Sequence, residues 1–337
     1  MIHSSSDTRH SSLVTRFGVL GLGERGQALA AAVNELPGVA LVAGTAGDEA
    51  AAGPGRGTWW GYATPEEVIA APQIDVVLVA NDDPASASAH ARAALAHGKP
   101  VLWFGYPAGL AQLDALVATA ERHDAPLSLP NELRFLPATR ALQASVGQGD
   151  AGPLLSVFAA WRTRRALGDP LRELGLPLLD YLRWCLGEEI ARAQVTAGPL
   201  FGADRPAALL ILRARDGLVL TVELAASLPA DYEQEDELTI EALGEAAALR
   251  AEPFNQAITV VGGAHRARLP WHRHAAYPLV ESFVAALRED REPPGSPAEL
   301  RPTYVLLEQL AAASADGEAR ALQPFPSGRV GEGGVAG

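Results

Sequence analysis

The sequence has little cysteine, little lysine and no basic run that could neutralise a phosphate backbone. The single cysteine, Cys185, excludes an intramolecular disulfide and any metal cluster built on several thiolates, and its apolar neighbours in YLRWCLGEE predict a buried core position. Basic charge comes from 26 arginines and one lysine, Lys99. Acidic residues outnumber basic ones by 40 to 27, which gives a formal charge of -13. Because phosphate backbones are bound by clustered basic side chains, nucleic acid is not an expected partner.

Long apolar runs are also absent. No run approaches the roughly 20 residues that span a bilayer, so we expect no membrane association. The first dozen residues, MIHSSSDTRHSS, lack the apolar core of a secretory signal, and we therefore expect a cytoplasmic protein. The 337 residues exceed the usual size of one domain and provide material for two buried cores.

The first part of the chain, residues 16–130, alternates short apolar runs with longer, alanine-rich segments. RFGVLGLG, VALVAGTA and IDVVLVAN are typical of strands, whereas RGQALAAAVNEL and PASASAHARAALAHG are compatible with helices. Strands that alternate with helices in this way form parallel sheets with crossover helices. The pattern predicts an N-terminal Rossmann domain, an α/β fold with a doubly wound parallel sheet.

The rhythm changes after residue 131. A helical segment over 136–148 and another over 176–187 are followed by consecutive extended runs, and helices are expected again over 275–290 and 303–315. Strands joined by tight turns such as RDGL indicate a mostly antiparallel open sheet. We expect a C-terminal α+β domain over 131–315 that binds substrate and mediates oligomerisation. Residues 1–15 should be flexible, and the glycine-rich residues 316–337 should be largely disordered.

A glycine-rich turn lies in the stretch FGVLGLGERG, at the end of the first predicted strand and the start of the first predicted helix. Gly21, Gly23 and Gly26 fit the pattern G-x-G-x-x-G of dinucleotide-binding sites. The first glycine permits the tight turn, the second lets backbone amides approach a pyrophosphate, and the third lets helix and strand pack closely. We expect the cofactor to contact Gly21, Leu22, Gly23, Glu24, Arg25 and Gly26. A glycine-rich turn without a ligand is the alternative.

The end of the second predicted strand bears on the choice of cofactor. An NAD site usually has an acidic residue about 20 residues after the glycines, and Thr45 occupies that position. Without a carboxylate there, the 2'-phosphate of NADP would not be repelled, and Arg25 or Arg56 could bind it. Asp48 is an alternative partner for the ribose of NAD. The sequence favours NADP over NAD, and loss of cofactor binding is the third possibility.

The order of motifs resembles the Gfo/Idh/MocA family, whose members include glucose-fructose oxidoreductase and inositol dehydrogenase. The resemblance extends over nearly the whole chain. The segments that carry it are GVLGLGERG, IDVVLVA, ALAHGKPVLW, NELRFLPATRAL, GDAGPLLSV, LGLPLLDYLRWCLG, RDGLVLTVELAAS, LTIEALGEAAALRAE and FVAALREDREPP. It implies NAD(P)-dependent oxidation or reduction of a sugar, a polyol or another small carbonyl or hydroxyl compound.

The resemblance also implies catalytic residues that this chain lacks. The family has Glu-Lys-Pro after its fifth strand, and here Gly105 and Tyr106 precede Pro107 instead. Lys99 lies before that strand, in a turn where the family commonly has lysine too. The family pattern D-x-x-x-H-x-x-D places its histidine base at Pro177, which cannot titrate. In the family, a Thr-Pro pair lies beside the nicotinamide. Asn81 and Asp82 occupy that position here. We expect Asn81 and the preceding Ala80 to contact the cofactor.

Three side chains are candidates to replace the missing acid and base. The hydroxyl of Tyr106 could hydrogen-bond a carbonyl and supply its proton, although the ring could instead close the floor of the pocket. Glu173 and Asp180 are seven residues apart on a predicted helix, so they would share a face and could act as acid or base if burial raises a pKa. Helix capping and solvation are the alternative for both carboxylates.

Two further groups of residues could bind a substrate anion or a metal ion. Arg162 and Arg164 in WRTRR point the same way along a strand and could hold the carboxylate or phosphate of a substrate, unless they belong to a solvated edge. His272 and His274 have a spacing that can chelate a metal. Because no acidic residue or cysteine lies nearby in sequence, we expect surface histidines and no metal.

Two hypotheses follow. The first is an oxidoreductase with atypical acid/base residues. The second is a catalytically inactive family member that serves as a dinucleotide or metabolite sensor, or as the partner subunit of an active homologue. In either case we expect a homo-oligomer, a dimer or tetramer, because the open sheet carries apolar runs such as LVLTVELAA on its outer face.

Overall fold

The computed structural model describes residues 14–21, 24–45, 59–81, 83–187, 189–200, 205–261, 265–268, 275–314 and 320–323. The chain divides into two compact units. The first comprises Met1–Pro130 and Ala276–Ser296, and the second comprises Asn131–Ala275 and Pro297–Gly337. Most of the predicted flexible N-terminus and disordered tail lie outside the described residues.

The first unit contains a six-stranded sheet in the order β3-β2-β1-β4-β5-β6, in which every pair of neighbours is parallel. Strand β4 has the sequence VVLV and is buried at every position, as expected of a parallel sheet covered on both faces. The predicted doubly wound sheet is confirmed. Its elements are β1 (Thr15–Leu20), α1 (Glu24–Glu35), β2 (Val39–Thr45), β3 (Trp60–Tyr62), α3 (Pro65–Ala70), β4 (Val76–Val79), α4 (Pro84–Ala96), β5 (Val101–Trp103), α5 (Leu110–His123) and β6 (Leu127–Ser128).

Helix α8 (Ala276–Arg288) also belongs to the first unit, although the sequence analysis assigned it to the second domain. Its Phe283 ring meets Phe17 of β1 edge to face, with centroids 6.5 Å apart. At its last turn, Arg288 donates a hydrogen bond to the carbonyl of Gly38 at 2.7 Å. The apolar face of this helix predicts burial but does not specify which core it covers.

The single lysine has a structural role in this unit. The Lys99 ammonium donates hydrogen bonds to the carbonyls of Ala71, at 2.6 Å, and Ile74, at 2.7 Å. Burial lowers the pKa of this ammonium. The side chain therefore ties the segment between α3 and β4 to the turn that precedes β5.

The second unit contains a nine-stranded sheet in the order β14-β13-β12-β11-β7-β10-β9-β8-β15. Its neighbours are antiparallel except for β7 and β10, which pair in parallel, so the predicted mostly antiparallel sheet is confirmed. Its elements are η1 (Glu132–Arg134), α6 (Pro137–Gln148), β7 (Leu154–Thr163), η2 (Leu171–Gly175), α7 (Leu176–Leu186), β8 (Ile190–Gly198), β9 (Ala207–Ala214), β10 (Val219–Ala225), β11 (Asp236–Gly244), β12 (Ala248–Glu252), η3 (Pro253–Asn255), β13 (Ala257–Val261), β14 (His265–Arg268), α9 (Pro297–Ala313) and β15 (Arg320–Ala321).

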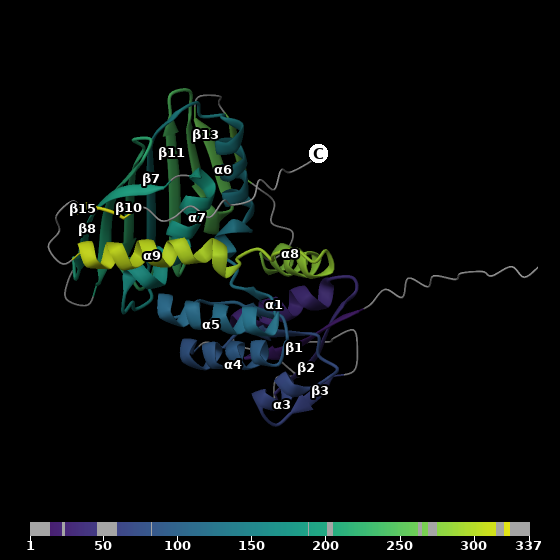
Figure 1. Ribbon diagram of the computed structural model, residues 1–337. Helices are drawn as coiled ribbons and strands as arrows, with labels where there is room; N and C mark the ends of the chain where they lie inside the picture. Colours follow the sequence, from purple (N-terminus) through teal and green to yellow (C-terminus); the bar gives the residue numbers. More distant parts are fainter. Residues whose placement is uncertain are drawn as a thin grey trace, which may run out of the picture. The chain divides into compact units, whose positions relative to one another are not determined.

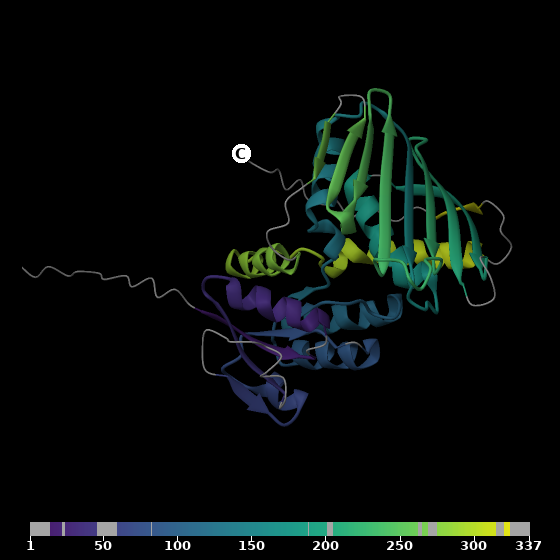
Figure 2. The same ribbon diagram turned by 180° about the vertical axis from the view of Figure 1, so that it is seen from behind.

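In the described part of the second unit, helices cover only one face of this sheet. Helices α6, α7 and α9 lie in front of the strands in Figure 1, whereas Figure 2 shows the opposite face with no described helix of this unit across it. Burial alternates accordingly along β9, where Leu210 and Leu212 are buried and Leu209 and Ile211 are exposed. The open face is therefore partly apolar.

The predicted burial of Cys185 on α7 is confirmed, and burial raises the pKa of its thiol to about 11.

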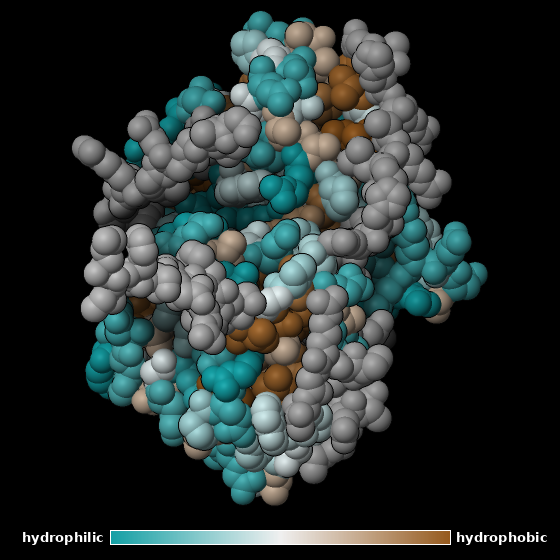
Figure 3. Space-filling view, turned by 90° about the vertical axis from the view of Figure 1, so that its right-hand side faces the viewer, coloured by the Kyte–Doolittle hydropathy of each residue, from teal (hydrophilic) through white to brown (hydrophobic). Residues whose placement is uncertain are grey.

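A side view of the surface shows mostly hydrophilic residues with scattered hydrophobic areas (Figure 3). Among the described segments, no helix combines the length and the hydropathy needed to cross a bilayer.

Candidate functional site

Gly21 follows β1 and has a left-handed backbone, with φ of +83°. A β-carbon at this position would lie 2.8 Å from both the backbone nitrogen and the Cα of Asn81, the second residue after β4. The Ala80 amide also donates a hydrogen bond to the carbonyl of Leu20 at 2.9 Å. The end of β1 therefore lies directly against the end of β4, and only glycine fits there without strain.

Gly26 lies in the first turn of α1, where a β-carbon would be 2.5 Å from the carbonyl oxygen of Gly21. This contact brings helix α1 close to β1, as the third glycine of a dinucleotide-binding turn does. Glu24 and Arg25 belong to the helix, but their side chains lie outside the described part of the chain. Leu22 and Gly23 lie outside the described residues altogether.

The glycine turn lies at the point where the order of the strands reverses. The chain places β2 and β3 on one side of β1, and β4, β5 and β6 on the other. Ligands of doubly wound sheets bind outside the carboxyl ends of the strands at such a switch point, and the N-terminus of the following helix favours an anion. The structure thus brings together Gly21, Gly26, Ala80 and Asn81.

The side chain of Asn81 has a partner that the sequence analysis missed. Its Oδ1 lies 3.1 Å from Nδ1 of His90 on α4, and both residues are half-buried. Asp83 caps the same helix, because its Oδ2 accepts a hydrogen bond from the Ser86 amide at 2.9 Å. Asp82 lies outside the described residues. No motif identifies His90, since one histidine within an alanine-rich helix has no distinctive spacing.

The end of β2, where dinucleotide-binding folds usually hold the adenosine ribose, is half-buried at Thr45. A β-carbon on the preceding Gly44 would lie 2.8 Å from the Trp59 ring, so this ring packs against the end of the strand. Asp48 and Arg56, the other candidates for recognition of the ribose or its phosphate, lie outside the described residues.

Tyr106 follows β5 and is half-buried. Before it, Trp103 is almost fully buried, with 1% of its surface exposed, and a β-carbon at Gly105 would lie 2.7 Å from the indole nitrogen. The indole thus requires glycine at the position beside Tyr106. The role of Tyr106 as a proton donor remains a prediction.

Asp180 on α7 is buried, with 1% of its surface exposed, and is fully engaged by other groups. Arg134 binds both of its oxygens, at 2.7 Å and 3.0 Å, and the side-chain amide of Asn131 donates to Oδ2 at 2.8 Å. Arg134 also forms an ion pair with Glu299 at 2.7 Å. Asn131 donates a second bond, at 2.7 Å, to the carbonyl of Pro177. This network favours a structural role for Asp180, and its catalytic role remains a prediction.

Glu173 lies in an exposed position, and its Oε1 accepts hydrogen bonds from the amides of Gly168, at 2.7 Å, and Asp169, at 2.9 Å. The expectation that Glu173 and Asp180 share a helix face is wrong, because one is exposed and the other buried. The reason is local: Leu171–Gly175 forms a π-helical turn, so seven residues no longer make two α-helical turns. Pro177 has no N–H to continue the regular hydrogen-bond ladder at this point.

The two arginines expected to hold a substrate anion have different surroundings. Arg162 makes a two-pronged ion pair with Glu223, with both N–O distances at 2.7 Å, and this hydrogen bonding raises the pKa of the guanidinium. Arg164 lies beyond the end of β7, is exposed and contacts the carbonyl of Ala230 at 3.4 Å. Arg162 is already neutralised by a carboxylate, and the substrate role of both remains a prediction.

Within the described ranges, no three histidine, cysteine or acidic side chains are grouped as metal ligands are. His272 and His274 lie outside the described residues.

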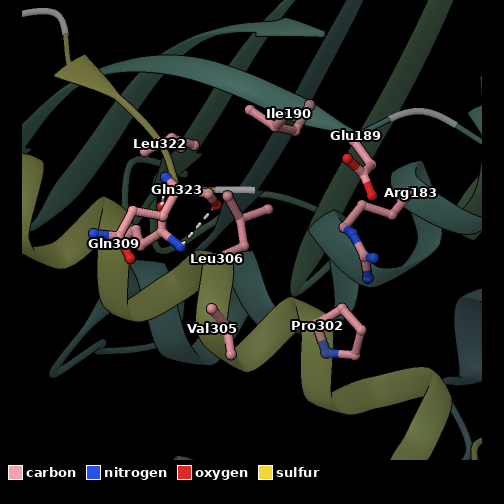
Figure 4. Close-up of a pocket in the computed structure, with 9 residues that line it drawn as sticks. All are labelled: Arg183, Glu189, Ile190, Pro302, Val305, Leu306, Gln309, Leu322 and Gln323. Atoms are coloured by element: carbon pink, nitrogen blue, oxygen red, sulfur yellow. Dashed lines mark hydrogen bonds between the residues drawn. The ribbon is translucent and has the colours of Figure 1, made fainter. Parts of the chain in front are cut away.

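A separate small hollow of about 40 Å³ lies in the second unit, between the end of α7, helix α9 and the segment after β15 (Figure 4). Arg183 is half-buried at its edge and donates to the Thr303 hydroxyl at 2.9 Å, while burial lowers the pKa of its guanidinium. The opposite end is closed by Gln309, which accepts a hydrogen bond from the Gln323 amide at 2.9 Å. Glu189 is paired with Arg215 at 3.1 Å, so the hollow has polar walls at both ends and aliphatic side chains between them.

Comparison with known proteins supports the fold. No family model and no curated protein sequence matches the chain. Solved structures do match, among them an oxidoreductase from Agrobacterium radiobacter in complex with NAD+, L-tartaric acid and magnesium, at 19% identity and a TM-score of 0.75, over 91% of this chain and 98% of that one.

Two further solved structures have similar values. WlbA dehydrogenase from Bordetella pertussis, in complex with NADH and UDP-GlcNAcA, is 16% identical with a TM-score of 0.74, over 92% of this chain and 98% of that one. A candidate myo-inositol dehydrogenase from Sinorhizobium meliloti is 23% identical with a TM-score of 0.73, over 92% of this chain and 100% of that one. At these identities the likeness shows that this chain has the two-domain fold of these proteins.

The close contact at Gly21 predicts a specific cost of substitution. Gly21→Ala should lower the free energy of unfolding by more than Gly98→Ala, because both glycines have positive φ but only Gly21 faces a backbone at 2.8 Å. The strain of φ alone is of the order of 1–2 kcal/mol. Denaturant unfolding of the two variants measures the difference. Equal losses would contradict the contact described for Gly21.

Proposed function

We propose that the protein is an NAD(P)-binding oxidoreductase of the Gfo/Idh/MocA type, acting on a sugar, a polyol or another small carbonyl or hydroxyl compound. The observation that carries this proposal is the glycine-restricted contact of Gly21 and Gly26 at the switch point of the parallel sheet. It is supported by the same fold in proteins described in complex with NAD+ or NADH.

The first unit supplies the groups that would hold the dinucleotide. The turn from Gly21 to Gly26 and the N-terminus of α1 fit a pyrophosphate, and Asn81 fits a ribose or phosphate oxygen. Thr45 in place of a carboxylate favours NADP over NAD, since a neutral side chain does not repel the 2'-phosphate. The nicotinamide would supply or accept the hydride, and the protein's own residues would orient the substrate and move its proton.

Titration of the purified protein with NADH and NADPH, followed by nicotinamide fluorescence, tests the proposed function. We expect binding at micromolar concentrations, and we expect Gly23→Asp to abolish it, because a carboxylate and added bulk would oppose the pyrophosphate. Gly147→Asp is the matched control, since Gly147 is exposed on α6 and the same charge there should leave affinity unchanged. Failure of both nucleotides to bind would refute the proposal.

The proposed proton donor is Tyr106, because the segment Gly105–Pro107 occupies the position where the family pattern has its lysine. In the reduction of a carbonyl, the carbon receives hydride and the oxygen must receive a proton, which a tyrosine hydroxyl can donate. Glu173 is exposed and Asp180 is held by Arg134, so neither is as well placed to exchange a proton with a ligand. Arg162 and Arg164 remain secondary candidates for binding an anionic group of the substrate.

Tyr106→Phe tests this role once a substrate is found. We expect turnover to fall by roughly 10²-fold to 10⁴-fold, the usual effect of removing a general acid, with dinucleotide affinity almost unchanged. Steady-state kinetics and fluorescence titration measure the two quantities. Turnover within about threefold of the wild type would exclude the role.

The alternative is a catalytically inactive member that binds a dinucleotide or metabolite as a sensor or partner subunit. The observation that favours it is the buried network around Pro177 and Asp180, in the place where the resemblance puts the base. Nucleotide binding without turnover on any polyol or sugar substrate would support this alternative.

We also propose that the open face of the second sheet joins copies of the chain. Exposed apolar side chains lie on strands β7, β9, β11 and β13 of this sheet, namely Phe158, Leu209, Ile211, Leu243 and Val261. Phe158, Leu243 and Val261 line a groove of about 620 Å³ whose wall also includes Arg250, paired with Glu241 at 3.1 Å and Glu252 at 3.0 Å. Charges of both signs are thus paired on this face, so an apposed copy of the chain would not meet an isolated charge there.

Light scattering after gel filtration tests this association. The wild type should have at least twice the mass of one chain, and Ile211→Arg should shift it to the monomer by placing a charge among the exposed apolar side chains of the face. Leu200→Arg is the control, because Leu200 is exposed at a similar level in the turn after β8. A monomeric wild type would contradict the proposal.

A further inference from the structure

His90 is half-buried on the first half of α4, with its Nδ1 3.1 Å from Oδ1 of Asn81. An amide oxygen only accepts hydrogen bonds, so the proton of this bond must be on Nδ1 of the imidazole. With Oδ1 held by His90, the Nδ2 end of the Asn81 amide is directed away from the ring. The bond therefore sets which end of the amide is available as a donor.

The location of Asn81 indicates what the Nδ2 donor could bind. The residue follows β4, and its backbone lies where a β-carbon on Gly21 would be only 2.8 Å away. It is thus at the switch point between β1 and β4, where a ligand of this sheet would bind. The phosphate and ribose oxygens of a dinucleotide are hydrogen-bond acceptors, which is the complement of a fixed N–H donor.

The fold itself has other supports at this point. Helix α4 is already capped by Asp83, and Pro84 starts its first turn. The backbone after β4 is already fixed by the Ala80–Leu20 hydrogen bond and by the contact with Gly21. The bond from His90 reaches only the side chain of Asn81, so its consequence is the orientation of that side chain.

We propose that His90 is a positioning residue for the nucleotide site, which orients the Asn81 amide so that its Nδ2 donates to a phosphate or ribose oxygen of the bound dinucleotide. This inference rests on the proposed function and adds a residue that neither the glycine motif nor the family resemblance identifies.

A double-mutant cycle on the full-length protein tests it, with NADH and NADPH as the probes in fluorescence titrations. His90→Ala should weaken binding of the better nucleotide about twofold to tenfold, the range expected for one lost hydrogen bond. Asn81→Ala should weaken it at least as much, and the double variant should bind like Asn81→Ala alone, because His90 acts through Asn81. His90→Gln keeps an N–H donor on a flexible side chain and should restore much of the affinity.

His97→Ala is the matched control, since His97 follows the same helix, is exposed, and its ring lies 2.9 Å from the Ala93 carbonyl within α4. It should leave affinity unchanged, and circular dichroism should show that every variant is folded. Independent effects of the two substitutions, or a His90→Ala variant that binds the nucleotide with wild-type affinity, would overturn the role of His90 while the nucleotide site stands. No binding by the wild type would overturn the proposed function and this inference together.

Discussion

The contact between three backbones at Gly21 and Gly26 is the constraint on which the candidate site depends. Strand β1, helix α1 and the end of β4 meet at distances that any side chain would violate, since a β-carbon would lie 2.5–2.8 Å from neighbouring backbone atoms. This contact places both the N-terminus of α1 and Asn81 at the switch point of the sheet. The position of Asn81 in turn gives His90 on α4 its partner.

In the second unit, the start of helix α7 depends on a buried ion pair. Arg134 and Asp180 bind through two short hydrogen bonds, and removing one partner of such a pair typically costs about 3–5 kcal/mol because the remaining charge stays buried. Asn131 extends the network to the carbonyl of Pro177. The region where the resemblance places a titrating histidine is therefore occupied by a proline and a charge network that stabilise the start of α7.

Much of this architecture follows from the sequence. Buried apolar runs such as VVLV predict parallel strands, and alternation such as AALLILRA predicts a sheet with one open face. The glycine spacing likewise predicts where a nucleotide would bind. These features are local patterns, so they are readable without knowledge of tertiary contacts.

Other features depend on partners far apart in the chain, which no local pattern contains. Helix α8 is amphipathic in sequence, but only the structure shows that it packs with Phe17 in the first unit. The π-helical turn at Leu171–Gly175 separates Glu173 from Asp180, although their spacing fits two α-helical turns. Arg134 as the partner of Asp180, and His90 as the partner of Asn81, could not be identified for the same reason.

The most direct test of nucleotide binding at this site is amide hydrogen exchange with and without NADH or NADPH. The account predicts slower exchange in two segments, residues 18–30 around the glycine turn and residues 79–91 from the end of β4 into α4, with strands β8 to β13 of the second unit unchanged. Protection confined to the second unit, or no protection anywhere at saturating nucleotide, would contradict it.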